Sequence, residues 1–238
     1  MQASTRAIVL SKIKYRDSDL IVKCYTETFG TVNYIIRGVF KSRKGHQKAA
    51  YFQLLSQLNL EVVHKNTSSL QSVKDMKVDH VYSSIHTNVL KSSIVMFLSE
   101  ILSQVLKEEE KNATLYSFIE HAMLWLDTEH KFSNFHLFFL LKLTKHLGFY
   151  PDTSNLSANY FNLVEGEFQN NPNKFAVSGN NLMILKSMLG IGFEGLNNIK
   201  MDALQRQNFL NVLLMYYELH IEGFKKPKSL SVLHQVFN

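Results

Sequence analysis

The sequence predicts an α+β protein, in which a small β-rich module is followed by a larger helical part. Three observations predict this class. Short runs of alternating or β-branched residues, separated by turn signals, fill residues 6–79. From about residue 80, apolar residues recur at helical spacing. An apolar content of 45% and a charged fraction of 19% indicate that the 238 residues can bury a sizeable core.

Five strands are expected in the N-terminal third. Turn signals separate them: a polar break at 16–19, a turn at 28–30, the region around 37–48, and a polar turn at 66–69. The strand segments are RAIVLSKIKY, LIVKCYTETFG, TVNYIIRGV, LNLEVVHK and LQSVKDMKV. So many strands in so short a stretch, with few prolines, favour a small antiparallel barrel or a sandwich.

The remainder of the chain predicts helices. Residues 151–180 are polar and carry two of the three prolines, so we expect a loop or a small irregular insertion there. We therefore divide the chain into a domain at 1–80 and a helical domain at 81–238. The expected helices cover residues 94–105, 114–127, 134–147 and 208–221, with a short amphipathic helix opened by Pro227.

The positive charge is concentrated in the first domain. Residues 1–80 carry a net charge of +7 and residues 81–238 a net charge of −1. From Thr28 through Leu60 there is no Asp or Glu. Such asymmetry favours a polyanionic partner, above all a nucleic acid. The alternative is an ordinary basic protein with a solvated surface.

The stretch from Thr28 through Leu60, which lacks Asp and Glu, predicts a flexible basic loop that binds a phosphate backbone. Gly38 and Gly45 give this loop the flexibility to follow the backbone. Cations interleaved with aromatic residues in a small barrel are typical of single-strand binding, although each aromatic residue could equally be a core residue. The candidate DNA-binding residues are Arg37, Lys41, Arg43, Lys44 and Lys48 in the loop, with Lys12, Lys14, Arg16 and Tyr34 beside it.

No catalytic, metal or cofactor site is expected. Cys24 is the only cysteine, which excludes an internal disulfide and a cysteine-rich zinc site, and we expect its thiol to be buried. The chain lacks HExxH and a phosphate-binding P-loop. Asp17 and Asp19 are interpreted as turn residues. Neither a signal peptide nor a membrane helix of ~18 apolar residues is recognisable, so a cytoplasmic protein is expected.

The N-terminal residues AIVLSKIKYRDSDLIVKCYTETFGTVNYIIRGVFKSRKG resemble the opening of the RecO family of bacterial recombination mediators. The order of features is similar: an apolar strand, a polar turn with acidic residues, a Thr-x-x-x-Gly turn, and a strand ending in Arg-Gly before a basic loop. LTKHLGFYPD and KSLSVLHQVF resemble that family's later motifs. Many members place four zinc-binding cysteines after the first of these motifs, but here that region has none. Leu156, Tyr160, Phe161 and Phe168 are expected to replace the metal by packing.

The resemblance implies an OB-fold domain followed by a helical domain. It also implies binding to single- and double-stranded DNA, annealing of complementary strands, and partnership with RecR. A further implied partner is the acidic, apolar C-terminal tail of single-strand-binding protein, and together these load RecA onto DNA at the nucleoid. Lys142, Lys145 and Phe138 are candidates for binding that tail, against the alternative that they form an ordinary helix face.

Two other functions remain open from the sequence. The first is a protein-interaction scaffold in which the barrel binds an acidic partner. The second is an RNA-binding or nuclease role, although residues 1–80 lack the carboxylate cluster that a metal-dependent nuclease needs.

Overall fold

The computed structural model describes residues 1–65, 68–106 and 111–237, except for the side chains of residues 44, 46 and 47. The chain forms two compact units. The first comprises Met1–Thr128 with Pro227–Ser229, and the second comprises Glu129–Lys226 with Leu230–Asn238. The expected boundary near residue 80 is where the barrel strands give way to helices; the first compact unit continues past it.

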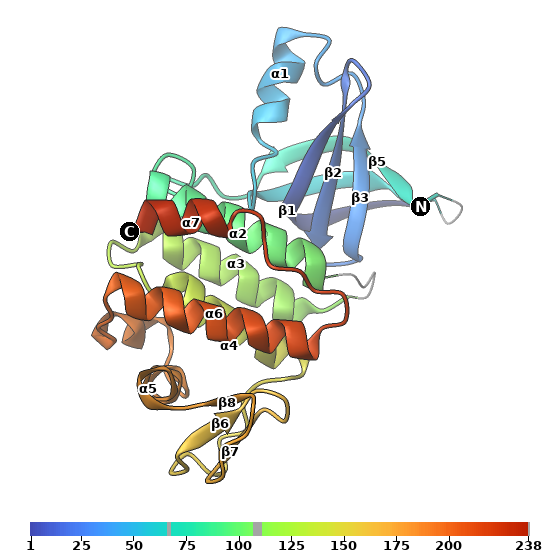
Figure 1. Ribbon diagram of the computed structural model, residues 1–238. Coiled ribbons are helices and arrows are strands. Elements are labelled where there is room, and N and C mark those ends of the chain that lie inside the picture. The colour runs from blue at the N-terminus through green and yellow to red at the C-terminus, as the bar shows by residue number, and fades with distance from the viewer. Residues whose placement is uncertain (66–67, 107–110, 238) are drawn as a thin grey trace. The chain divides into compact units, whose positions relative to one another are not determined.

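The first unit contains a closed five-stranded barrel with the order β1-β2-β3-β5-β4 (Figure 1). All neighbouring strands are antiparallel except β3 and β5, which pair in parallel over three residues. A short helix, α1, lies between β3 and β4. This is the OB-fold architecture, as expected. The elements are β1 (Gln2–Tyr15), β2 (Asp19–Thr26), β3 (Gly30–Ile36), α1 (Arg43–Ala50), β4 (Gln57–Val63) and β5 (Leu70–Val78).

Alternation along the strands builds the barrel core. Ala7 and Val9 of β1 and Leu20, Val22 and Cys24 of β2 point inward and are buried. Because successive side chains of a strand face opposite sides, these positions are spaced by two. Burial raises the pKa of the Cys24 thiol well above its ordinary value, which agrees with the expected inert thiol.

Two helices, α2 (Val89–Val105) and α3 (Ala113–Thr128), complete the first unit. Asn112 accepts a hydrogen bond from the Leu115 N–H, as expected for the start of α3. The Arg6 guanidinium joins the barrel to α3, because it contacts Glu27 at 2.8 Å and Glu120 at 2.5 Å. Gln57 Nε2 also donates to the Glu120 carbonyl at 3.0 Å. The barrel and α3 therefore share several polar contacts.

The second unit combines helices with a small three-stranded sheet of order β7-β6-β8. The polar stretch that was expected to be irregular instead carries three short strands, so that expectation was incomplete. The elements are α4 (Phe135–Leu147), β6 (Tyr160–Asn162), β7 (Glu167–Gln169), β8 (Ala176–Val177), α5 (Gly179–Met188), a 3-10 helix (Phe193–Asn198), α6 (Ala203–His220) and α7 (Leu230–Phe237).

Aromatic packing holds the small sheet. The rings of Phe161 and Phe168 lie 4.9 Å apart, and Phe161 also contacts Tyr216 of α6 at 5.7 Å. Leu156, by contrast, is 41% exposed, so its expected contribution to this packing was wrong. Within the described ranges, no three His, Cys, Asp or Glu side chains gather into a metal-binding group. No helix of the described residues is long and apolar enough to cross a membrane.

Candidate nucleic-acid interface

The basic segment after β3 is docked against the turn that joins β1 to β2. The Gly38 N–H donates to Asp19 Oδ1 at 2.8 Å, and the Phe40 N–H donates to the Ser18 carbonyl at 3.0 Å. The hydrogen bond from Gly38 is the main reason that the pKa of the Asp19 carboxyl is lowered. Asp17 lies in the turn, as predicted, whereas Asp19 is the first residue of β2 and positions the segment that carries Arg37 and Lys41.

Docking brings cations from two parts of the sequence to one end of the barrel, where α1 also lies (Figure 1). Lys14 Nζ lies 5.8 Å from the centre of the Phe40 ring, so the strand cation contacts the basic segment directly. All the described side chains of this cluster are exposed except that of Lys48, which is half-buried. We call it the basic end; it comprises Lys12, Lys14, Arg16, Arg37, Lys41, Arg43 and Lys48.

Asp17, Asp19 and Asp75 lie near the seven cations of the basic end. Asp17 is exposed in the β1–β2 turn, and Asp19 accepts from the Gly38 N–H. Asp75 pairs with Lys48 at 3.7 Å in a contact where both side chains are about half exposed. Such exposed pairs contribute only about 0.2–1 kcal/mol and are readily replaced by a stronger anion. Desolvation by neighbouring atoms lowers the pKa of Lys12, although its side chain is exposed. Among the described residues, the cations of the basic end therefore outnumber the carboxylates near them.

Arg16 occupies an unusual backbone position at the tip of the β1–β2 turn. Its φ is 52°, in the left-handed region that favours glycine, and its guanidinium lies 5.1 Å from the Tyr15 ring. A side chain there costs about 1 kcal/mol relative to glycine. In the OB-fold, the loop between the first two strands is one of the elements that bind oligonucleotides.

The expected flexible loop is in part a helix. Residues 43–50 form α1, and the Ser42 side chain caps it by accepting a hydrogen bond from the Gly45 N–H at 3.1 Å. Gly45 lies inside the helix instead of serving as a hinge. The Lys44 backbone belongs to α1, but its side chain is outside the described part of the chain, so its predicted DNA contact stays a prediction.

Two predicted site residues are core residues. Tyr34 is fully buried in the barrel, and its hydroxyl lies 3.1 Å from His64 Nε2. It cannot stack on a base, so the alternative interpretation was correct. Phe138 is fully buried in α4. Lys142 Nζ lies 5.1 Å above the Phe138 ring, and Lys145 is exposed, so these two cations do not border an open apolar pocket at Phe138.

Sequence reasoning overestimated the free charge of the first domain. Arg6 is engaged by Glu27 and Glu120, and Lys23 Nζ donates to the Ser103 carbonyl at 2.6 Å. These cations belong to the interior contacts of the first unit. What the sequence could not show was the link from Ser18 and Asp19 to the basic segment, because it joins residues about twenty positions apart through backbone groups.

The chain was compared with known families and proteins. Residues 1–82 match the family model described as "Recombination protein O N terminal", and residues 86–230 match "Recombination protein O C terminal". The chain belongs to the RecO family.

Relatives in this family align over their full length. "DNA repair protein RecO" of Christiangramia forsetii is 46% identical over 238 residues, and its namesake in Flavobacterium johnsoniae is 45% identical over 238 residues. The Bacteroides fragilis protein of the same name is 32% identical over 243 residues. Each match covers 100% of both chains. The RecO family resemblance seen in the sequence is confirmed, as is the barrel followed by helices.

Proposed function

We propose that this RecO family protein acts in DNA repair as a recombination mediator. It binds single- and double-stranded DNA through the basic end of its barrel, anneals complementary strands, and helps to load RecA onto DNA covered by single-strand-binding protein. RecR and the tail of single-strand-binding protein are its partners. It acts in the cytoplasm at the nucleoid, and its action is physical instead of covalent.

The observation that carries this proposal is the basic end itself. Cations from the β1–β2 turn and from the segment after β3 are gathered by backbone hydrogen bonds, and the opposing carboxylates are few. Lys and Arg that contact phosphates release counterions, which gives affinity with little dependence on base sequence. A protein that contacts any backbone can hold two complementary strands together, which is what annealing requires.

The test is fluorescence anisotropy of a labelled single-stranded oligonucleotide at rising salt. The variant combines Lys41→Glu, Arg43→Glu and Lys44→Glu. We expect its affinity to fall by at least tenfold, and the slope of log K against log salt to become shallower by about 2, since up to three phosphate contacts are lost. Strand annealing should fall with it.

The matched control is Lys131→Glu, Lys174→Glu and Lys200→Glu, which makes the same charge change at exposed positions of the second unit. It should leave the salt slope unchanged. Equal losses in both variants would show that only net charge matters, and would reject the basic end as the DNA site.

A further inference from the structure

A groove opens in the barrel where β3 and β5 separate. The two strands pair only from Asn33 to Ile35 and from Leu70 to Ser72. Beyond this point, β5 continues to Val78 along β4, whereas the chain after β3 turns away toward α1. The groove between them has a volume of about 440 Å³. It shares Arg37 and Lys48 with the basic end, whereas its apolar lining residues lie outside that cluster.

One edge of β5 has no strand partner in this groove. Residues 73–78 pair with β4 on one side, and no described backbone hydrogen bond joins them to β3 or α1 on the other. An unpaired strand edge is a template for another extended chain, and natural proteins usually protect such edges. Adding a strand to an exposed edge is a recurring way to bind peptides.

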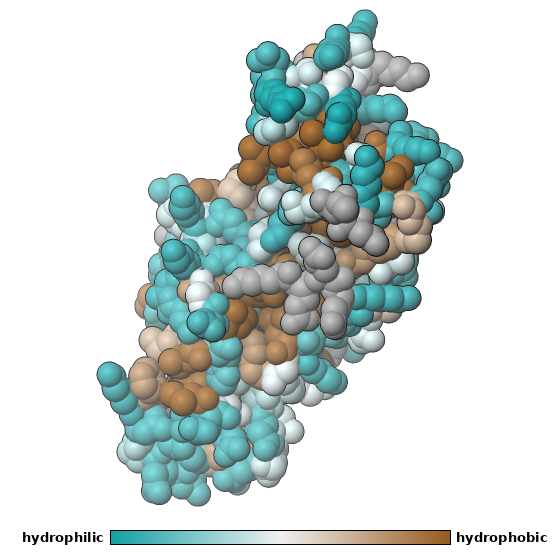
Figure 2. Space-filling view, turned by 90° about the vertical axis from the view of Figure 1, so that its right-hand side faces the viewer, coloured by the Kyte–Doolittle hydropathy of each residue, from teal (hydrophilic) through white to brown (hydrophobic). Residues whose placement is uncertain are grey.

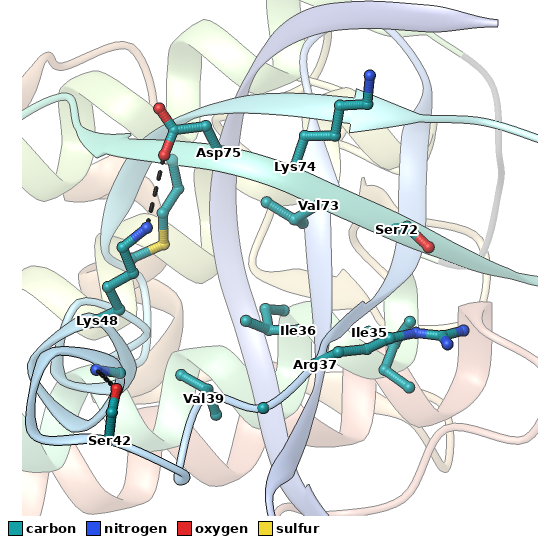
Figure 3. Close-up of a pocket in the computed structure, with 13 residues that line it drawn as sticks. Ile35, Ile36, Arg37, Val39, Ser42, Lys48, Ser72, Val73, Lys74 and Asp75 are labelled. Atoms are coloured by element: carbon teal, nitrogen blue, oxygen red, sulfur yellow. Dashed lines mark hydrogen bonds and ion pairs between the residues drawn. The ribbon is translucent and has the colours of Figure 1, made fainter.

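The lining of the groove combines apolar and polar side chains. Val73 on β5 lies across the groove from Ile36, and the buried Val39 lies on the same side as Ile36, while the side chains of Arg37 and Lys74 extend outward (Figure 3). Met76 continues the apolar lining and, like Ile36 and Val73, packs against the barrel core. In the space-filling view, hydrophobic surface lies just below the hydrophilic end that carries α1 (Figure 2).

The charge at the groove is mostly positive. Among the described lining side chains, Arg37, Lys48 and Lys74 are cations and Asp75 is the one carboxylate, which pairs with Lys48 in an exposed contact. A strand edge bordered by cations disfavours pairing with a second copy of itself and favours an acidic strand. Among the described side chains that line the groove, none is aromatic, whereas proteins that bind single strands stack bases on aromatic rings.

From these observations we infer that the groove between β3 and β5 is a docking site for an acidic, extended segment of a partner protein. The segment would pair with the edge of residues 73–78, place alternate apolar side chains against Ile36, Val73 and Met76, and direct its carboxylates at Arg37 and Lys48. This function is additional to DNA binding, although the groove shares these two cations with the basic end.

The probe is a fluorescein-labelled peptide of about eight residues in which Glu or Asp alternates with Val or Ile, the length of an ordinary strand. The control peptide has the same charge, but proline replaces alternate apolar residues and prevents pairing. We expect saturable binding of the first peptide only, together with slowed amide hydrogen exchange at residues 73–78. Equal binding of both peptides would overturn the inference.

Three variants of the full chain test the site. Met76→Glu places a charge on the apolar wall and should weaken peptide binding by about tenfold or more. Lys48→Glu should also weaken it, whereas Lys131→Glu, at an exposed position of the second unit, should not. Thermal unfolding confirms that each variant folds. A loss of binding in Lys131→Glu that equals the loss in Lys48→Glu would reject the site.

A gain of affinity provides the most specific test, because misfolding cannot produce it. Asp75→Asn removes the carboxylate that competes for Lys48 and should tighten peptide binding severalfold. Glu165→Gln makes the same charge change in the second unit and should have no effect.

The test of peptide docking can be separated from the test of DNA binding. The triple reversal at Lys41, Arg43 and Lys44 should lose DNA while the peptide still protects residues 73–78. If an oligonucleotide, and not the peptide, protects these amides, the groove belongs to the DNA site and the inference is wrong, although the proposed function would stand.

Discussion

Arg16 occupies a strained backbone position within the proposed DNA site. Its backbone adopts φ 52°, where glycine has no steric cost, yet the chain places a long cation there, at the tip of the β1–β2 turn. The strained position presents a guanidinium beside Tyr15 at the basic end. Strain of this kind is often kept where it serves a function.

Arg16→Gly should therefore change stability and binding in opposite directions. We expect the free energy of unfolding to rise by up to about 1 kcal/mol, because glycine accepts this conformation freely, and the DNA affinity to fall severalfold, because one cation is lost. Urea unfolding and anisotropy measure the two effects. Arg16→Ala serves as the control, since it should lose affinity without gaining stability.

Asp127 is a second residue whose surroundings determine its chemistry. Burial opposes ionisation of its carboxyl, but the backbone N–H groups of Ser83, Ser84 and Ile85 all donate to it, at 2.8 to 3.0 Å. Together with the Ser83 hydroxyl, these donors lower its pKa to about 2. The carboxylate fixes the segment that leads from the barrel into α2 against the end of α3.

This lowered pKa predicts a pH dependence. Stabilisation by the Asp127 carboxylate is complete above its unfolded pKa of about 4, and is lost as pH falls through its folded pKa of about 2. As pH falls through this range, the free energy of unfolding of the native protein should decrease by about 2 kcal/mol more than that of the Asp127→Asn variant. The measurement is urea unfolding as a function of pH. Asp17→Asn, at an exposed position, should follow the native protein; parallel curves for the native protein and Asp127→Asn would contradict the assignment.

At the scale of elements, α1 depends on Gly45 for a reason that helix propensity does not reveal. A Cβ atom at Gly45 would lie 2.4 Å from the Val39 carbonyl oxygen and 3.3 Å from the Ser42 Oγ that caps the helix. The close approach of the helix to the preceding segment therefore requires glycine. Alanine normally stabilises a helix by about 1 kcal/mol relative to glycine. Helix propensity alone would therefore predict that replacing Gly45 by alanine stabilises the protein.

Gly45→Ala should destabilise the first unit by about 1–3 kcal/mol, because the new methyl group meets backbone that cannot move aside without shifting α1. DNA affinity should also fall, since α1 carries Arg43 and Lys48. Chemical denaturation and anisotropy measure the two effects. The control is Ala50→Gly, at the exposed end of α1. Gly179→Ala is unsuitable because the φ of Gly179 is positive. A Gly45→Ala variant that is more stable than the native protein would refute the packing argument.

At the scale of the whole molecule, the barrel and the helices α2 and α3 form one compact unit. Three contacts from different strands support this: Arg6 with Glu120, Thr31 with the Leu106 carbonyl at 2.8 Å, and Tyr25 stacked on Tyr116 at 6.1 Å. A fragment that ends after β5, the last strand of the barrel, would lack Leu106, Tyr116 and Glu120, the partners in these three contacts. A fragment that ends at Thr128 would keep them.

A fragment of residues 1–128 should therefore unfold cooperatively and retain DNA binding, whereas a fragment of residues 1–82 should lack a cooperative transition. Circular dichroism melting and anisotropy on both fragments provide the comparison. Equal, sharp melting of the two fragments would show that α2 and α3 do not stabilise the barrel.

The sequence by itself determined the order of elements and the class of the fold. Strand alternation, turn residues and helical spacing are local signals, so five strands followed by helices could be recognised, and the motifs around Asp19, Gly38 and Gly148 pointed to the RecO family. The concentration of cations before residue 80 was also visible, since charge needs no coordinates. Short strands at 160–177 escaped prediction because two or three residues carry no periodic pattern.

Only the tertiary structure decided which residues face solvent and which meet. Tyr34 and Phe138 read as available aromatic residues, but the barrel and the helical core bury them. Arg6 and Lys23 count as free charge in the sequence and are engaged inside the first unit. The basic end and the groove beside β5 arise from hydrogen bonds and strand separation between segments far apart in the chain, which local pattern cannot specify because it records neighbours along the backbone and not across space.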